Sequence, residues 1–278
     1  MRNSKFLTRL GISVVIASLF FASCHKNTTP VAEDTGYATD QATTEKTFND
    51  VESIADQGSM LSAGGNLNYR TTATTSGGCA MVTRAPGTIT INFGATDCTC
   101  KDGRNRRGEI IVSYTGNYSD SGSVHTITFN NFFQNDNKVT GSKTVTNMGH
   151  NSLGQPFYDV AINGALTLSG GGTISAVWQR IRTWTAGYAT PTDFTDDVYS
   201  VSGSGTMIRA NGDTVLVNIS TAAPLVMAYG CKWIEAGTIT YTLPGGLNRS
   251  LDYGNTAICD NQAVLTLPSG VSYNITLP

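Results

Sequence analysis

Apolar and polar residues alternate along four well-separated segments of the chain. These segments are 88–93, 125–129, 238–243 and 273–277. Side chains of a strand point to opposite faces in turn, so each segment would bury an apolar face and expose a hydroxyl-rich face. This pattern is typical of antiparallel sheet. Residues 110–112 are apolar at every position and predict an interior strand.

Turn signals separate the strand-like segments. They occur at 102–103, 120–122, 170–172, 211–213, 244–246 and 268–270. Asn211-Gly212 between two apolar runs is the strongest hairpin signal among them. The spacing predicts an all-β antiparallel meander of ten or more strands. A sheet of that size must curl or split into two layers, so a sandwich and a curled open half-barrel both remain possible.

One segment near the N-terminus follows a helical period instead. Phe48, Val51 and Ile54 fall on one face of a helix predicted over residues 39–57, and Gly58 would end it. The acidic residues lie on the opposite face. We expect a short helix that covers one end of the sheet, with a free docking helix as the alternative.

The first residues have the zones of a secretory signal. A basic start is followed by the apolar run 10–21, which is shorter than the roughly 20 residues of a membrane helix. Phe21-Ala22-Ser23-Cys24 then resembles the lipobox of bacterial lipoproteins, in which the cysteine is acylated (palmitate among the usual chains). Acyl chains anchor a protein stably without a membrane helix. An ordinary signal peptide with a chance cysteine is the alternative.

The residues after Cys24 bear on its destination. His25 and Lys26 stand where an aspartate retains many proteobacterial lipoproteins in the inner membrane, which favours the outer membrane. The periplasmic or surface face is not readable. The expected domains are a signal peptide at 1–23, a lipid-anchored tether at 24–38, a helix and loop at 39–78, and a β domain at 79–278.

Charge excludes one class of partner. Removal of the signal peptide takes the formal net charge from −2 to −5, and most of that negative charge lies in residues 25–78. The β domain is therefore close to neutral, whereas nucleic-acid binding needs a broad basic face. We expect the membrane, reached through the lipid, and an unidentified protein or glycan as partners.

Five cysteines remain once Cys24 is acylated. In an oxidising compartment they predict disulfides, and an odd number leaves one thiol over. We expect Cys231 to pair with Cys259, and Cys79 to pair with either Cys98 or Cys100. A metal site at Cys98 and Cys100 is disfavoured, because zinc would need two further close ligands.

The chain resembles uncharacterised cell-envelope lipoproteins of Bacteroidetes-type bacteria. The resemblance rests on the lipobox, on residues 47–51, on the segment from Cys100 to Gly108 and on Gly230-Cys231-Lys232-Trp233. It implies an envelope lipoprotein with a cysteine-stapled β body, and it brings no activity with it.

No catalytic or cofactor motif stands out, and no metal site is predicted. His125 and His150 are the only candidate bases in the β domain, and the serine-hydrolase elbow is missing. Glycosidase chemistry would need two converging carboxylates, for which the candidates are Asp159, Glu235 and Asp252. Asp193, Asp196 and Asp197 could bind calcium weakly but lack the spacing of a calcium loop.

Two further clusters could contact a ligand. Lys101, Arg104, Arg106 and Arg107 form a basic loop that could meet phosphates, although a solvated turn is the simpler interpretation. Trp178 and Trp184 share a strand face and would form a stacking surface if exposed, or core if buried.

We therefore expect a non-enzymatic envelope protein with a binding or structural role. The alternatives are a carrier that holds an apolar ligand on a curled sheet, and a glycan-active enzyme.

Overall fold

The computed structural model describes residues 32–60, 66–67, 79–191 and 193–277. The expected signal peptide, Cys24, the first part of the tether and nearly all of the 61–78 loop lie outside the described residues. No helix among the described residues is long and apolar enough to cross a membrane.

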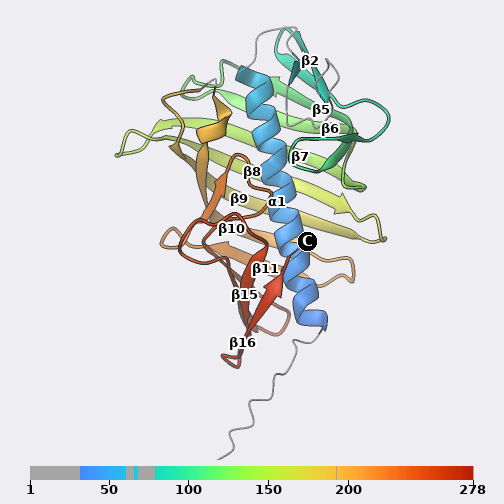
Figure 1. Ribbon diagram of the computed structural model, residues 1–278, viewed down its shortest axis with the longest axis vertical. Helices are drawn as coiled ribbons and strands as arrows, with labels where there is room; N and C mark the ends of the chain where they lie inside the picture. Colours follow the sequence, from blue (N-terminus) through green and yellow to red (C-terminus); the bar gives the residue numbers. More distant parts are fainter. Residues whose placement is uncertain (1–31, 61–65, 68–78, 192, 278) are drawn as a thin grey trace, which may run out of the picture.

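One open antiparallel sheet forms the body of the molecule (Figure 1). Its strands follow one another in chain order, except that β4 pairs only with β5 and β12 pairs with β10 beside β11. The elements are α1 (Ala32–Met60), β1 (Asn66–Leu67), β2 (Ala80–Ala85), β3 (Thr88–Asn92), β4 (Cys98–Thr99), β5 (Asn105–Tyr114), β6 (Val124–Gln134), β7 (Asn137–His150), β8 (Pro156–Thr167), β9 (Thr173–Ala186), η1 (Phe194–Asp196), β10 (Val198–Ile208), β11 (Thr214–Ile219), β12 (Leu225–Ala228), β13 (Thr238–Thr242), β14 (Asn248–Asp252), β15 (Gln262–Thr266) and β16 (Ser272–Thr276).

The predicted antiparallel meander is confirmed, and of the two forms left open the structure adopts the curled half-barrel. A second sheet layer is absent from the described residues, because α1 lies across the concave face and takes its place (Figure 1). Between Tyr37 and Gln57, the side chains of the helix itself are buried on nearly every side.

The helix differs from the prediction at both ends and in its position. It begins at Ala32, inside the segment expected to be a tether, and it continues through Gly58 to Met60. Contacts with the sheet explain both extensions. Tyr37 is buried and donates a hydrogen bond to Asp213, while a side chain at Gly58 would meet Ile91 of β3 at 2.6 Å. The helix therefore runs along the concave face instead of covering one end of the sheet.

The helix and the sheet approach each other closely at Phe48. Its ring lies directly over Gly164 of β8, where a Cβ atom would come within 2.5 Å of the ring. Phe48 also meets the Trp178 ring edge to face, with ring centroids 6.2 Å apart. A glycine is needed at this strand position because any larger side chain would push the helix outward.

Two disulfides cross-link segments of the β domain. Cys79 bonds to Cys98 with Cα atoms 5.7 Å apart, and Cys231 bonds to Cys259 with Cα atoms 5.5 Å apart. Both distances are typical of disulfides. Cys100 is the buried free thiol, so the choice left open by the sequence falls on Cys98.

Candidate functional site

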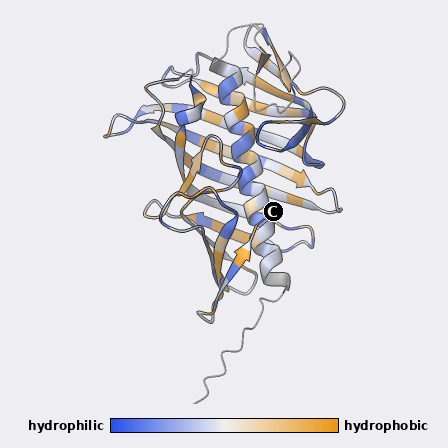
Figure 2. Cartoon of the chain, in the orientation of Figure 1, coloured by the Kyte–Doolittle hydropathy of each residue, from blue (hydrophilic) through white to orange (hydrophobic). Residues whose placement is uncertain are grey.

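Ion pairs fill the interface between the helix and the sheet. Figure 2 shows hydrophilic residues interspersed with hydrophobic ones along α1 where it lies against the strands. Glu45 pairs with Arg180 of β9 at 2.9 Å, and Glu52 pairs with Arg182 at 3.0 Å. Arg182 also pairs with Asp56. The prediction that the acidic face of the helix points away from the sheet was wrong.

A second set of charges joins the helix to the expected basic loop. Arg104 lies 3.2 Å from Asp50, and Arg106 lies 2.7 Å from Asp102. Both arginines are buried, so the interpretation of this loop as a solvated turn was wrong for them. Lys101 is exposed, and Arg107 forms surface pairs with acidic residues of neighbouring turns. Two of the four cations of this loop, Arg104 and Arg106, therefore form buried ion pairs.

Burial and pairing shift the pKa values of these groups in opposite directions. Burial by itself would raise the pKa of Glu52, but Arg182 and Lys143 hold it below its ordinary value. The pKa of Asp56 is raised by burial in spite of Arg182. Burial lowers the pKa of Lys46 to about 8 although Asp50 lies beside it. Glu52 thus carries a stable negative charge within the interface.

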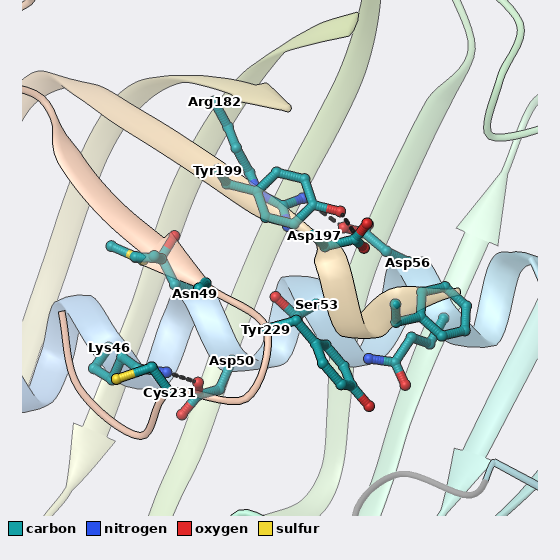
Figure 3. Close-up of a pocket in the computed structure, with 14 residues that line it drawn as sticks. Lys46, Asn49, Asp50, Ser53, Asp56, Arg182, Asp197, Tyr199, Tyr229 and Cys231 are labelled. Carbon is teal, nitrogen blue, oxygen red and sulfur yellow. Dashed lines mark hydrogen bonds and ion pairs between the residues drawn. The ribbon is translucent and has the colours of Figure 1, made fainter. Parts of the chain in front are cut away.

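A narrow cavity lies beside this network, between the helix and β12 (Figure 3). Its volume is about 30 Å³, which has room for water and for no larger ligand. Asp197 forms part of its wall and accepts hydrogen bonds from Trp184 Nε1 at 3.1 Å and from the Tyr199 hydroxyl at 3.2 Å. Burial raises the pKa of Asp197 to about 6 in spite of both donors. Several polar groups of this wall pair with one another, and the cavity is too small for an organic ligand.

The three aspartates considered for calcium have separate partners. Asp193 accepts hydrogen bonds from the backbone and side chain of Thr195 at the start of η1. Asp196 accepts one from Thr190, and Asp197 points to the aromatic donors. Their carboxylates are used individually to shape the loop.

A larger cavity of about 400 Å³ lies near the C-terminal end of α1. Four aromatic side chains contribute to its wall: Tyr118, Tyr158, Trp184 and Tyr188. The first two rings pack against each other with centroids 5.2 Å apart. The remaining wall consists of prolines, serines, asparagines and a histidine, and none of its described residues is charged.

Two of the four aromatic residues of this cavity are held in place by the sheet. Tyr158 and Trp184 are buried on the concave faces of β8 and β9, whereas Tyr188 is 38% exposed in the loop after β9. Burial raises the pKa of both Tyr118 and Tyr158, so their hydroxyls stay protonated at neutral pH. Three buried rings and one accessible ring therefore line the same uncharged cavity.

The predicted tryptophan pair is only partly connected to this site. Trp178 and Trp184 do share the concave face, but both are buried, so they form core and not the exposed stacking surface. Trp184 reaches the aromatic cavity, while Trp178 packs under Phe48. Of the two histidines, His150 lines the cavity, and His125 is buried between Tyr114 and Tyr118.

The carboxylates considered for glycosidase chemistry have individual partners. Asp159 accepts a hydrogen bond from Gln179, and Asp252 accepts one from Thr238. Glu235 lies close to Cys231 and Cys259, but those sulfur atoms are bonded to each other and cannot act as thiolate ligands for a metal.

Sequence reasoning missed the residues that anchor the helix. Arg180 and Arg182 occupy positions of β9 with the same parity as Trp178 and Trp184, and they are buried with them. Charged residues on the apolar face of a strand imply a buried partner of opposite charge. That signal was present in the sequence and points to the acids of the helix.

No protein-family model, curated protein or solved structure matches this chain.

Proposed function

We propose that this chain is a lipid-anchored protein of the bacterial cell envelope, placed at the outer membrane, that binds a neutral saccharide in the aromatic cavity without altering it. The signal sequence and the cysteine at position 24 support localisation in the cell envelope, and two disulfides fit an oxidising compartment. The resemblance to Bacteroidetes-type lipoproteins points in the same direction.

The observation that carries the proposed ligand is the chemistry of the cavity wall. Sugar rings present C–H groups that pack on the faces of aromatic rings, and their hydroxyls exchange hydrogen bonds with amides and hydroxyls. The wall offers both kinds of partner, with Tyr188 as the accessible ring and with Asn117 and Ser119 among the polar groups. Aromatic walls with few polar groups are the usual form of small-molecule sites.

Binding is favoured over the two alternatives. Hydrolysis of a glycosidic bond needs two carboxylates beside the bond, and the described wall of this cavity supplies none. A carrier would hold its apolar ligand on the concave face of the sheet, but α1 occupies that space and its polar side chains face the strands.

Calorimetric titration with neutral oligosaccharides tests the ligand. The purified protein should bind at least one glucose- or N-acetylglucosamine-based trisaccharide. Replacement of the exposed ring in Tyr188→Ala should weaken binding by roughly tenfold, as loss of one stacked ring is worth about 1–1.5 kcal/mol. Tyr188→Phe retains the ring and should bind nearly as well. Absence of heat with every neutral oligosaccharide, or equal affinity in Tyr188→Ala, would contradict the proposal.

Metabolic labelling with a palmitate analogue tests the lipid anchor and the membrane localisation. The protein should carry the label and sediment with outer membranes, and Cys24→Ala should lose both properties. If the Cys24→Ala variant still carried the label, the lipid would be attached at another residue.

A further inference from the structure

A second cavity lies along the N-terminal half of α1, away from the aromatic cavity. Its volume is about 570 Å³. The helix forms one wall with Thr39, Thr43 and Thr47, which recur every four residues and so share a face. The turns after β6 and β8 and the segment around Trp233 form the others. This space is large enough for a small organic ligand.

Two buried donors in this wall have no acceptor among the described residues. Tyr253 is 91% buried, given its 9% relative exposure, and its hydroxyl makes no hydrogen bond to any described residue. The same holds for Nε1 of Trp233, which is an obligate donor. A buried donor without a partner is costly, and such groups in native structures call for an explanation. Both side chains line the cavity, but the donor atoms themselves lie beneath its surface, so a ligand acceptor reaches them once the groups that cover them move aside.

Two asparagines add donors of fixed orientation. Asn135 accepts a hydrogen bond from the backbone N–H of Asn105 at 3.0 Å, and Asn137 accepts one from the backbone N–H of Ser169 at 3.0 Å. A backbone N–H can only meet the carbonyl oxygen of an amide, so these contacts fix which way each amide points. The NH₂ groups of both side chains are consequently left as the ends available to a ligand.

The charges of the wall favour the same kind of ligand. Lys232 makes no ion pair with a described residue, whereas Lys46 and Arg104 are both paired with Asp50. Of the two carboxylates of the wall, only Asp40 has its charge matched by a cation, while Asp260 is exposed. Asp40 pairs with Arg209 at 2.6 Å, and Asp260 accepts the backbone N–H of Gln262 at 2.9 Å. Lys232 is therefore the cation whose charge is left to attract an anion.

We propose that this donor-lined cavity is a second binding site, which takes a ligand that bears an oxyanion, either a phosphate or a carboxylate group. Tyr253, Trp233 and the two asparagine amides would donate to its oxygens, and Lys232 would balance its charge. Hydrogen bonds to a charged acceptor are the stronger class, and the Tyr253 hydroxyl and Trp233 Nε1 would gain an acceptor that they lack among the described residues. The site is independent of the saccharide proposal, since the two cavities share no lining residue.

Titration followed by NMR of the tryptophan indole N–H groups separates the two sites. The purified protein has three tryptophans, and each variant Trp→Phe assigns one peak. Inorganic phosphate or glucuronate should shift the Trp233 peak in a saturable way and leave those of Trp178 and Trp184 in place. Vesicles that contain phosphatidylglycerol, compared with pure phosphatidylcholine vesicles, test a lipid headgroup as the source of the phosphate. If only one of these anionic probes shifts the Trp233 peak, that probe identifies which kind of oxyanion the site binds.

Two variants test the assigned donors. Tyr253→Phe removes one hydroxyl and keeps the ring, and Lys232→Gln removes the charge at a partly exposed position; each should weaken binding by roughly tenfold. Tyr188→Phe, the same change in the other cavity, should leave the affinity for the anion unchanged. Retention of the dispersed peaks of Trp178 and Trp184 shows that each variant is folded. A Trp233 peak that none of the anionic probes moves, or affinities that neither variant lowers, would overturn the proposal.

Discussion

Removal of Arg182 tests the account of the helix–sheet interface. Its guanidinium lies 3.0 Å from Glu52 and also pairs with Asp56, and all three side chains are buried. The variant Arg182→Met keeps the length and the apolar stem but leaves Asp56 without its cation, while Glu52 retains Lys143. Breaking a buried pair from one side costs about 3–5 kcal/mol. That is a large share of the roughly 5–15 kcal/mol of a typical domain.

Urea unfolding of the purified protein measures this loss as a lower midpoint at unchanged slope. A matched control is Arg107→Met, because Arg107 also pairs with two aspartates but does so at the surface, where water screens the charges and the loss of stability should be much smaller. The double variant Arg182→Met with Asp56→Leu should recover most of the stability, since it no longer buries an uncompensated charge. Equal losses in Arg182→Met and Arg107→Met would refute the reasoning.

Three further predictions concern pH, packing and disulfide pairing. Because burial raises the pKa of Asp197 from 3.8 to about 6, the folded state holds this proton more tightly than the unfolded chain. The contribution is complete below about pH 4 and is lost as the pH rises through 6, so urea midpoints of Asp197→Asn should gain on the wild type over that range. Gly164→Ala should cost about 1–3 kcal/mol by calorimetric unfolding because its methyl group meets Phe48, whereas Gly170→Ala, with nothing within 4 Å, should stay within about 0.5 kcal/mol. Cys98→Ser should lower stability by about 2–5 kcal/mol and Cys100→Ser should leave both disulfides intact in peptide mass maps; the reverse result would show that Cys79 pairs with Cys100.

The strands of the sheet could be predicted from the sequence because the residue pattern that specifies them is local. Strict alternation of apolar and hydroxyl residues, with glycine turns between the runs, specifies antiparallel strands without knowledge of their partners. The pairing of Cys231 with Cys259 also followed from order along the chain. By contrast, the choice between Cys98 and Cys100 depends on whether the cysteine within the short strand β4 or the one just after it lies next to Cys79, and local pattern does not determine that.

The position of the helix was not predictable in the same way. Its apolar stripe indicated one buried face, but α1 is buried nearly all round, and its polar face is accommodated only because Arg180, Arg182 and Lys143 lie opposite. Those contacts join residues more than 90 positions apart. The aromatic cavity was likewise hidden, since its rings come from three separate segments whose convergence depends on the curl of the sheet.

The measurement that tests the central claim most directly is a glycan array that carries neutral and acidic saccharides, probed with the purified protein and with Tyr188→Ala. The account predicts that the wild-type protein binds a set of neutral glycans and that the signal on that set falls by about tenfold when the exposed ring of the aromatic cavity is removed. Binding that Tyr188→Ala retains in full, or an array on which no neutral glycan gives a signal, would contradict it.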